Sequence, residues 1–139
     1  MIKFIKTDSM KVEVLKEQEK FLSSKDRIKN AIELDSVLAF DIFDDDLLMG
    51  FAMLKNFDEG CFFLWDFAID YKYQNKGYGT NVLKELIIFM NHNYKMHTIT
   101  TTYVYGNNKI KHIYEKIGFV ETSIVDENNI HEVNMVYKI

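Results

Sequence analysis

The chain has 139 residues, a length that fits one domain (residues 1–139) with a sizeable hydrophobic core. Hydrophobic residues make up 47% of the sequence and charged residues 27%, a balance typical of globular proteins, and the formal net charge is -4. Because no long cluster of Lys and Arg occurs, these features disfavour a partner that is a nucleic acid or an anionic membrane.

The cysteine and histidine content limits the chemistry further. The single cysteine, Cys61, excludes an internal disulfide and favours a reducing compartment. Residues 1–6 are too short and too charged for a signal peptide, and no apolar run approaches the length of a membrane span. We therefore expect a cytoplasmic protein. The four histidines show no metal-ligand spacing, so we expect no metal.

The first third of the chain predicts one strand, two helices and a hairpin. Residues 2–6 alternate apolar and charged side chains, as a half-buried strand does. Short polar residues before position 10 offer N-caps for a helix over 10–22, and a second short helix is expected over 26–34. Apolar residues at 37–43 and 47–54 predict two strands joined by a turn of three aspartates.

The middle of the chain contains its most apolar segment. Residues 62–69 are interrupted only by Asp66, so we expect this strand to lie in mid-sheet, covered on both faces. A loop over 71–79 follows, and apolar residues spaced along 80–91 predict an amphipathic helix. The β-branched residues of 97–104 predict the next strand.

The last third predicts a short helix and a closing pair of strands. A turn at 106–108 leads into a helix that ends near Lys116, with Gly118 as its C-terminal cap, and 119–124 and 132–138 form an antiparallel pair. Three strands in hairpin succession, followed by a helical crossover, predict an α/β (α+β) fold. We expect a mixed, mostly antiparallel sheet of about six or seven strands, flanked by about four helices.

A glycine-containing loop over residues 74–79 links the apolar strand to the helix that follows it. The N-terminus of a helix offers free backbone N–H groups and a positive dipole, and glycines let an anion approach closely. The pattern therefore favours phosphate binding. It lacks the third glycine of a Rossmann fingerprint, where Val82 stands, and the Gly-Lys-Ser/Thr ending of a P-loop. The alternative is a turn that only starts the helix tightly.

Two segments resemble the GNAT superfamily of acetyltransferases. Gln74-x-x-Gly77-x-Gly79, directly after a strand that ends in Phe67-Ala68-Ile69, resembles the acetyl-CoA-binding segment of that superfamily. A second segment, from Asn107 through Tyr114 to Gly118-Phe119, resembles the one that ends most members. One helix and one strand separate the two segments, as the family requires. Together they cover about residues 62–119, and the N-terminal third matches only in its order of elements.

This resemblance implies the GNAT fold and a binding site for the cosubstrate acetyl-CoA. The strands at 62–69 and 97–104 would part, and the pantetheine arm would lie between them. It would pair with the main chain of Ala68 and Ile69, and Asn107 would orient it. The amides of the loop would hold the pyrophosphate, namely those of Gln74, Asn75, Lys76, Gly77, Tyr78, Gly79 and Thr80.

The resemblance also places the hydroxyl of Tyr114 near the acetyl sulfur. When an amine attacks a thioester, the amine must lose a proton and the leaving thiolate must gain one. A Tyr hydroxyl with an ordinary pKa near 10 stays protonated at pH 7 and can serve as the acid. The alternative is that Tyr114 is a core aromatic that anchors its helix.

Asp66 is the second candidate for a catalytic residue. A buried carboxylate without a partner is costly, so either a backbone amide or a Lys satisfies Asp66, or it faces the cleft. In the cleft it would bind a substrate ammonium or accept its proton through water. Residues 64–67 also resemble a strand of spermidine/spermine N-acetyltransferases, in which an acidic pair precedes Phe. Because Trp65 occupies the first acidic position, water alone is an alternative base.

Three functions follow as hypotheses. The first is acetyl-CoA-dependent N-acetylation of a small primary amine, with polyamines or diamines as leading acceptors. The second is acetylation of a lysine or N-terminus in a protein or peptide, and the third is a non-catalytic acyl-CoA-binding or interaction module. We expect no nucleic-acid or membrane partner. A homodimer is possible because such dimers are common among relatives and cover sheet edges.

Overall fold

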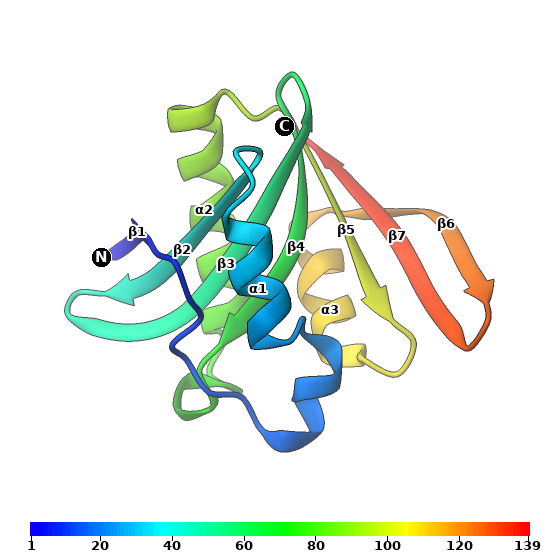
Figure 1. The fold of residues 1–139 in the computed structure, drawn as a ribbon, viewed down its shortest axis with the longest axis horizontal. Helices are drawn as coiled ribbons and strands as arrows, with labels where there is room; N and C mark the ends of the chain where they lie inside the picture. Colours follow the sequence, from blue (N-terminus) through cyan, green and yellow to red (C-terminus); the bar gives the residue numbers. More distant parts are fainter.

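The computed structural model describes residues 1–139 and contains one seven-stranded sheet in the order β1-β2-β3-β4-β5-β7-β6 (Figure 1). All neighbouring strands are antiparallel except β4 and β5, which are parallel, so the predicted mixed, mostly antiparallel sheet is confirmed. The strands are β1 (Ile2–Lys6), β2 (Val37–Asp44), β3 (Leu47–Asp58), β4 (Cys61–Ile69), β5 (Thr98–Val104), β6 (Val120–Glu127) and β7 (Ile130–Lys138).

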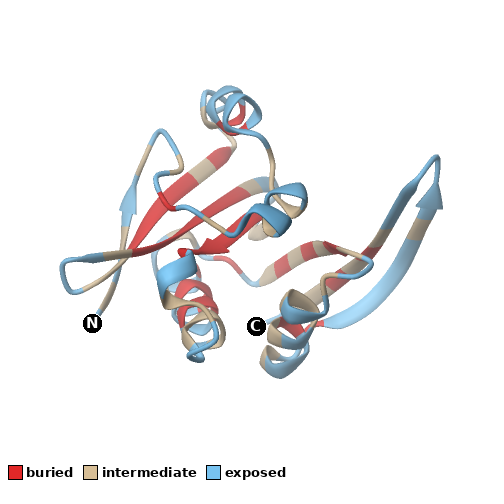
Figure 2. Cartoon of the chain, turned by 90° about the horizontal axis from the view of Figure 1, so that it is seen from below, coloured by how far each residue is buried: buried red, intermediate tan, exposed pale blue.

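Helices cover both faces of the sheet. Side chains of α2 and α3 join the larger hydrophobic cluster on one face, and α1 contributes to a smaller cluster on the other (Figure 2). No helix has the length and apolar character needed to span a membrane. The helices are the 3₁₀ helices η1 (Lys16–Phe21) and η2 (Tyr71–Tyr73) and the α-helices α1 (Lys25–Ile32), α2 (Tyr78–Tyr94) and α3 (Asn108–Ile117).

The prediction of an α-helix over residues 10–22 was wrong. Residues 10–15 have no regular structure, and only the 3₁₀ helix η1 follows them. Tertiary partners bind the polar backbone groups that a helix would need: the Glu13 N–H donates to a carboxylate oxygen of Asp70, and the Glu13 carbonyl accepts from Tyr71. This extended path also buries Val12 against the sheet.

Other predicted boundaries differ by a few residues. The strand expected over 47–54 continues to Asp58, and a turn at Glu59 and Gly60 follows it. The helix expected over 80–91 is the longer α2. Gly118 ends α3 with a φ of 118°, the left-handed conformation expected for a C-terminal glycine.

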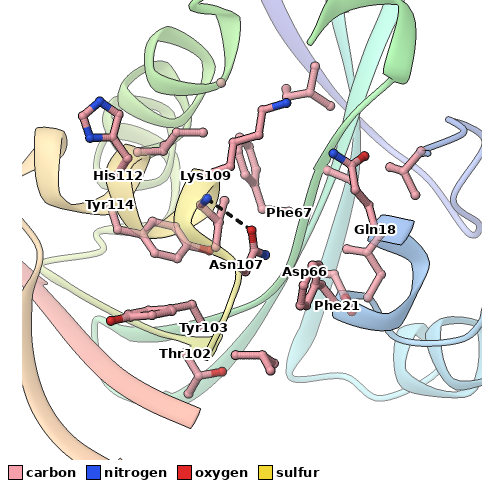
Figure 3. Close-up of a pocket in the computed structure, with 18 of the residues that line it drawn as sticks. Gln18, Phe21, Asp66, Phe67, Thr102, Tyr103, Asn107, Lys109, His112 and Tyr114 are labelled. Carbon is pink, nitrogen blue, oxygen red and sulfur yellow. Dashed lines mark hydrogen bonds between the residues drawn. The ribbon is translucent and has the colours of Figure 1, made fainter. Parts of the chain in front are cut away.

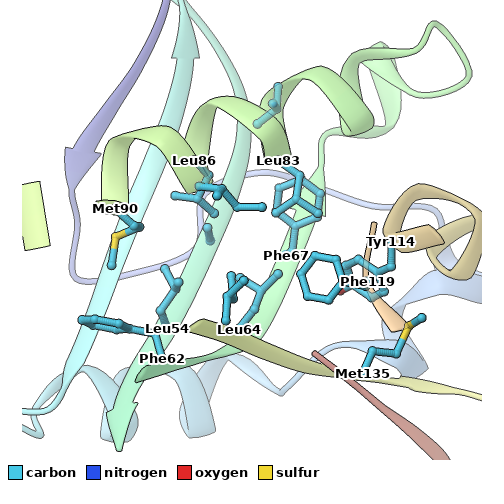
Figure 4. Packing of buried hydrophobic residues seen from close by; sticks show 14 of the residues in the cluster. Leu54, Phe62, Leu64, Phe67, Leu83, Leu86, Met90, Tyr114, Phe119 and Met135 are labelled. Atoms are coloured by element: carbon cyan, nitrogen blue, oxygen red, sulfur yellow. The ribbon is translucent and has the colours of Figure 1, made fainter. Parts of the chain in front are cut away.

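Helix α2 packs its predicted apolar face on the sheet. The side chains of Leu83, Leu86 and Met90 are fully buried and contact a cluster that includes Leu64 and Phe67 of β4 (Figure 4). This packing holds the first turn of α2 at the end of β4. The position of the loop between them is therefore fixed by the core.

A bulge in β4 lies where the pairing of β4 with β5 ends. Leu64 pairs with Leu54 of β3 and Asp66 pairs with Met53, so Trp65 has no partner across that pair of strands. The parallel pairing of β4 with β5 ends at the same place, between Leu64 and Thr101. Because a bulge bends its strand and increases the local twist, β4 diverges from β5 beyond this point (Figure 2). The predicted parting of the two strands is confirmed.

The core packing of α2 generates a stability prediction. Leu86→Ala removes a side chain with 0% exposure, and we expect the free energy of unfolding to fall by about 2–5 kcal/mol. Urea unfolding followed by circular dichroism measures this change. Ile88→Ala on the same helix is the control, since Ile88 is 61% exposed and should change stability by about 0.5 kcal/mol or less.

Candidate functional site

A cavity of about 560 Å³ opens where β4 and β5 diverge. Its walls come from both strands, the first turn of α2, α3, and the N-terminal segment that includes η1 and α1. Figure 3 shows Gln18, Phe21 and Asp66 along one side and Tyr103 and Tyr114 along the other. Its volume lies in the range of small-ligand pockets.

Most of the site residues predicted from sequence line this single cavity. Lys76 and Tyr78 are the exceptions, and the ring of Tyr78 packs against Tyr73 with 6.3 Å between ring centres. The prediction for these two residues concerned their backbone amides. The position of their side chains does not test it. The predicted residues that line the cavity are Asp66, Ala68, Ile69, Gln74, Asn75, Gly77, Gly79, Thr80, Asn107 and Tyr114.

The two glycines at the start of α2 serve different physical purposes. Gly77 is the N-cap residue and has a φ of 80°, and a Cβ there would meet no atom within 4 Å. A Cβ on Gly79 would lie only 2.8 Å from Cδ1 of Ile113, so this glycine lets α3 pack on the first turn of α2. No side chain caps the N-terminus of α2. The opening at Gly77 therefore leaves its backbone accessible to an anion.

The side chain of Gln74 joins three parts of the site. Its Nε2 donates to the carbonyl of Ile69 at 2.9 Å, which holds the loop against the end of β4. It also exchanges two hydrogen bonds of 2.8 Å with the amide of Gln18 on η1. Lys109 of α3 donates to Gln74 Oε1 at 3.1 Å. Sequence reasoning assigned only the backbone of Gln74 to the site, so this side-chain role is new.

The edge of β4 that faces β5 is unpaired from Trp65 onward. Ala68 and Ile69 pair with β3 on their other edge, opposite Phe51 and Gly50. An extended ligand can therefore add to this edge in the way that a further strand would. Asn107, the remaining predicted binding residue, caps α3 and accepts a hydrogen bond of 3.4 Å from the Ile110 N–H.

Tyr114 lies on α3 and is 4% exposed. Its hydroxyl oxygen lies 3.3 Å from Oγ1 of Thr101, which in turn lies 3.1 Å from the carbonyl of Leu64. Burial raises the pKa of Tyr114 to about 12, and the nearby charge of Asp66 acts in the same direction. The residue both anchors its helix, packed 5.2 Å from Phe119 between ring centres, and lines the cavity.

Asp66 is 4% exposed and only half satisfied. Its Oδ1 accepts a hydrogen bond of 2.9 Å from the Ser23 N–H, whereas the buried Oδ2 has no hydrogen-bond partner. Burial raises the pKa of this carboxyl, and the Ser23 bond and the charge of Arg27 partly oppose that rise. A backbone amide therefore satisfies one oxygen of Asp66, and the other is buried without a partner in a residue that lines the cavity.

Several cavity residues were missed by sequence reasoning. Those from the N-terminal segment escaped because the helix expected over 10–22 gave no reason to bring that segment to β4. The sequence of α3 carried a usable signal, since Lys109, His112 and Lys116 are spaced three and four residues apart and so share one face of that helix. The missed lining residues include Gln18, Phe21, Arg27, Thr102, Tyr103, Lys109 and His112.

Comparisons with known proteins agree with this geometry. Residues 7–119 match the Acetyltransferase (GNAT) family, which is most of the chain. A search of curated proteins found no match. The resemblance noted in the sequence therefore receives independent support from the family match.

Solved structures share the fold at low sequence identity. An IAA acetyltransferase from Bacillus cereus has a TM-score of 0.74 at 15% identity, with 100% of both chains covered. A GNAT family acetyltransferase from Elizabethkingia anophelis with acetyl-CoA bound has a TM-score of 0.74 at 17% identity, covering 99% of this chain and 98% of that one. Spermidine N-acetyltransferase from Vibrio cholerae, in complex with CoA and spermine, has a TM-score of 0.68 at 19% identity, covering 84% and 76%.

The parted strands, the open helix N-terminus after β4 and the family match lead to the same assignment. The first two were expected from the order of motifs in the sequence, and the third covers both motifs. The chain belongs to the acetyltransferase (GNAT) family and is an acetyl-CoA-dependent N-acetyltransferase.

Proposed function

We propose that the cavity between β4 and β5 binds acetyl-CoA and a small primary amine together, and that the amine attacks the acetyl group directly. The observation that carries this proposal is the joining of three features in one cavity. They are the open N-terminus of α2, the unpaired edge of β4, and two polar groups, the Tyr114 hydroxyl and Asp66 Oδ2.

The start of α2 is suited to the pyrophosphate of acetyl-CoA. Free amides and the positive end of the helix dipole favour an anion there, and Gly77 leaves room for it. Lys109 lies beside this loop, at 3.1 Å from Gln74, and adds a positive charge. The pantetheine arm would then follow the unpaired edge of Ala68 and Ile69, where its amides replace the missing strand.

Two proton transfers accompany the reaction, and each has a candidate residue. Asp66 Oδ2 can receive the ammonium of the acceptor, or accept its proton through a water molecule. The Tyr114 hydroxyl, whose raised pKa keeps it protonated at pH 7, can donate to the departing sulfur. As the new C–N bond forms and the C–S bond breaks, negative charge develops on that sulfur.

Different observations favour different classes of acceptor amine. A polyamine or diamine fits the free carboxylate oxygen of Asp66, and solved spermidine N-acetyltransferases share the fold. Lys20 and Arg27 also line the cavity, however, and their positive charge favours a monoamine over a long polyamine. Peptides with a free lysine or N-terminus remain the second class to be assayed.

Two further expectations stay predictions. The sheet has open edges at β1 and β6, and a homodimer would cover one of them. We also predict a cytoplasmic location, because a single cysteine favours a reducing compartment.

Removal of the Tyr114 hydroxyl tests whether this residue donates the proton to the departing sulfur. We expect Tyr114→Phe to lower kcat at least about tenfold, because the departing sulfur loses its donor, while the Kd for acetyl-CoA changes little. Thiol release measures kcat and calorimetry measures the Kd. Tyr137→Phe is the control, since Tyr137 packs against Phe119 outside the cavity. Unchanged turnover in Tyr114→Phe would remove this residue from the mechanism.

Asp66→Asn separates function from stability. Folding raises the pKa of Asp66, so its ionised form disfavours the folded state as pH rises through that pKa. We therefore expect Asp66→Asn to raise Tm at pH 7 and to lower kcat/KM for the amine at least about tenfold.

Asp70→Asn is the matched control for that experiment. Asp70 is 6% exposed, but backbone N–H groups of Lys72 and Glu13 satisfy both of its oxygens. Its replacement should lower Tm, because an amide nitrogen cannot accept one of these bonds. A loss of stability in both variants would contradict the functional assignment of Asp66.

A further inference from the structure

The wall of the cavity around Asp66 carries positive charge as well as the carboxylate. Arg27 of α1 and Lys20 of η1 both line it. The ammonium of Lys20 lies 5.1 Å from the centre of the Phe21 ring. The guanidinium of Arg27 is near enough to lower the pKa of Asp66, yet it takes part in none of the ion pairs of the structure.

Arg27 and Asp66 are therefore opposite charges that do not satisfy each other. Asp66 Oδ2 is buried without a hydrogen-bond partner, and Arg27 is exposed and lines the same cavity. A ligand with an ammonium and an anionic group would satisfy both. A guanidinium binds a carboxylate with two parallel hydrogen bonds, which fixes its orientation as well as its position.

The neighbouring side chains indicate what lies between the two charges. Phe21, Phe63 and Trp65 line the same cavity, so aromatic surface is present in it as well as charge. Apolar walls with a few polar groups are typical of sites for small ligands that carry a hydrophobic portion. A free amino acid with an apolar side chain has all three features.

The same charges disfavour a polycation. A polyamine that places one ammonium on Asp66 would bring its other ammonium groups into a cavity that Arg27 and Lys20 also line, and like charges repel. The only other carboxylate in the lining belongs to Glu132 of β7. Lys109 and Lys116 lie on the α3 side, where they suit the phosphates of acetyl-CoA.

We propose that the acceptor is a zwitterionic amine, an amino acid or a similar primary amine with a carboxylate, whose ammonium binds Asp66 and whose carboxylate binds Arg27. This inference rests on the proposed function and narrows its acceptor. The amine loses a proton and attacks the acetyl carbon, the C–S bond breaks as the amide C–N bond forms, and the thiolate takes up a proton. The products are an N-acetyl amino acid and CoA.

A matched series of acceptors tests the proposal. Phenylalanine, phenylalaninamide and phenethylamine differ only at the carboxylate, and leucine with its amide and decarboxylated amine gives a second series. Spermidine and putrescine represent the polycations. We expect the wild-type protein to show a kcat/KM for the better amino acid at least about tenfold above that for its decarboxylated amine. A preference for the decarboxylated amines or for spermidine would overturn the proposal.

Arg27→Gln assigns the effect to one side chain. It should raise KM for the amino acid at least about tenfold, leave kcat nearly unchanged, and change KM for the decarboxylated amine by no more than about twofold. Arg27→Lys should restore part of the affinity. Lys29→Gln is the control, because Lys29 is exposed on the same helix and does not line the cavity. Equal effects of Arg27→Gln on both acceptors would also overturn the proposal.

A binding measurement distinguishes failure of this inference from failure of the proposed function. Calorimetry of phenylalanine or leucine on the CoA-loaded protein requires no turnover. If phenylalanine or leucine binds in an Arg27-dependent way but no amine causes thiol release, the proposed transfer is wrong and the proposed class of ligand stands. Acetylation of amines whether or not they carry a carboxylate would support the proposed transfer and overturn the zwitterionic acceptor.

Discussion

The bulge at Trp65 is the local feature on which the rest of the site depends. An unbroken β4 would pair with β5 along its whole length, and its backbone groups would be satisfied within the sheet. With Trp65 outside the pairing, β4 bends away after Leu64, and the edge from Trp65 to Ile69 is left without a neighbouring strand. An unpaired edge inside a protein is costly unless something else binds it. A substrate that is extended and rich in amides is suited to that position.

The polar groups in the opening are held at the expense of stability. Asp66 has one buried oxygen without a partner, and burial raises the pKa of both this carboxyl and Tyr114. A core built for stability alone would replace such groups with apolar side chains of similar size. By contrast, Asp70, four residues along the chain, has both oxygens satisfied by backbone amides and pins the N-terminal segment to the loop. The two aspartates therefore differ in that Asp70 has both oxygens bonded, whereas Asp66, which we propose binds the amine, has one oxygen without a partner.

The N-terminal segment connects the two halves of the substrate site. Gln18 exchanges hydrogen bonds with Gln74 beside the start of α2, and the Ser23 N–H binds Asp66 a few residues later. The same short segment therefore contacts the loop proposed to hold the pyrophosphate and the carboxylate proposed to hold the amine. The extended path of residues 10–15, held at Glu13 by hydrogen bonds with Asp70 and Tyr71, leads the chain to this position. Arg27 follows on α1 and lines the same cavity, where we propose that it binds the carboxylate of the acceptor.

The sequence alone determined the order of elements, the mixed sheet, the glycine loop before α2 and the motif that ends in Gly118 and Phe119. These features depend on local periodicity, on conformations that glycine adopts readily, and on spacing along the chain. It did not determine the path of residues 10–15, because their backbone partners lie about 57 positions away at Asp70. Nor did it identify the Gln18–Gln74 pair or the approach of Arg27 to Asp66. Those contacts join segments that are distant in sequence, and only the packing of the N-terminal segment on the parted sheet brings them together.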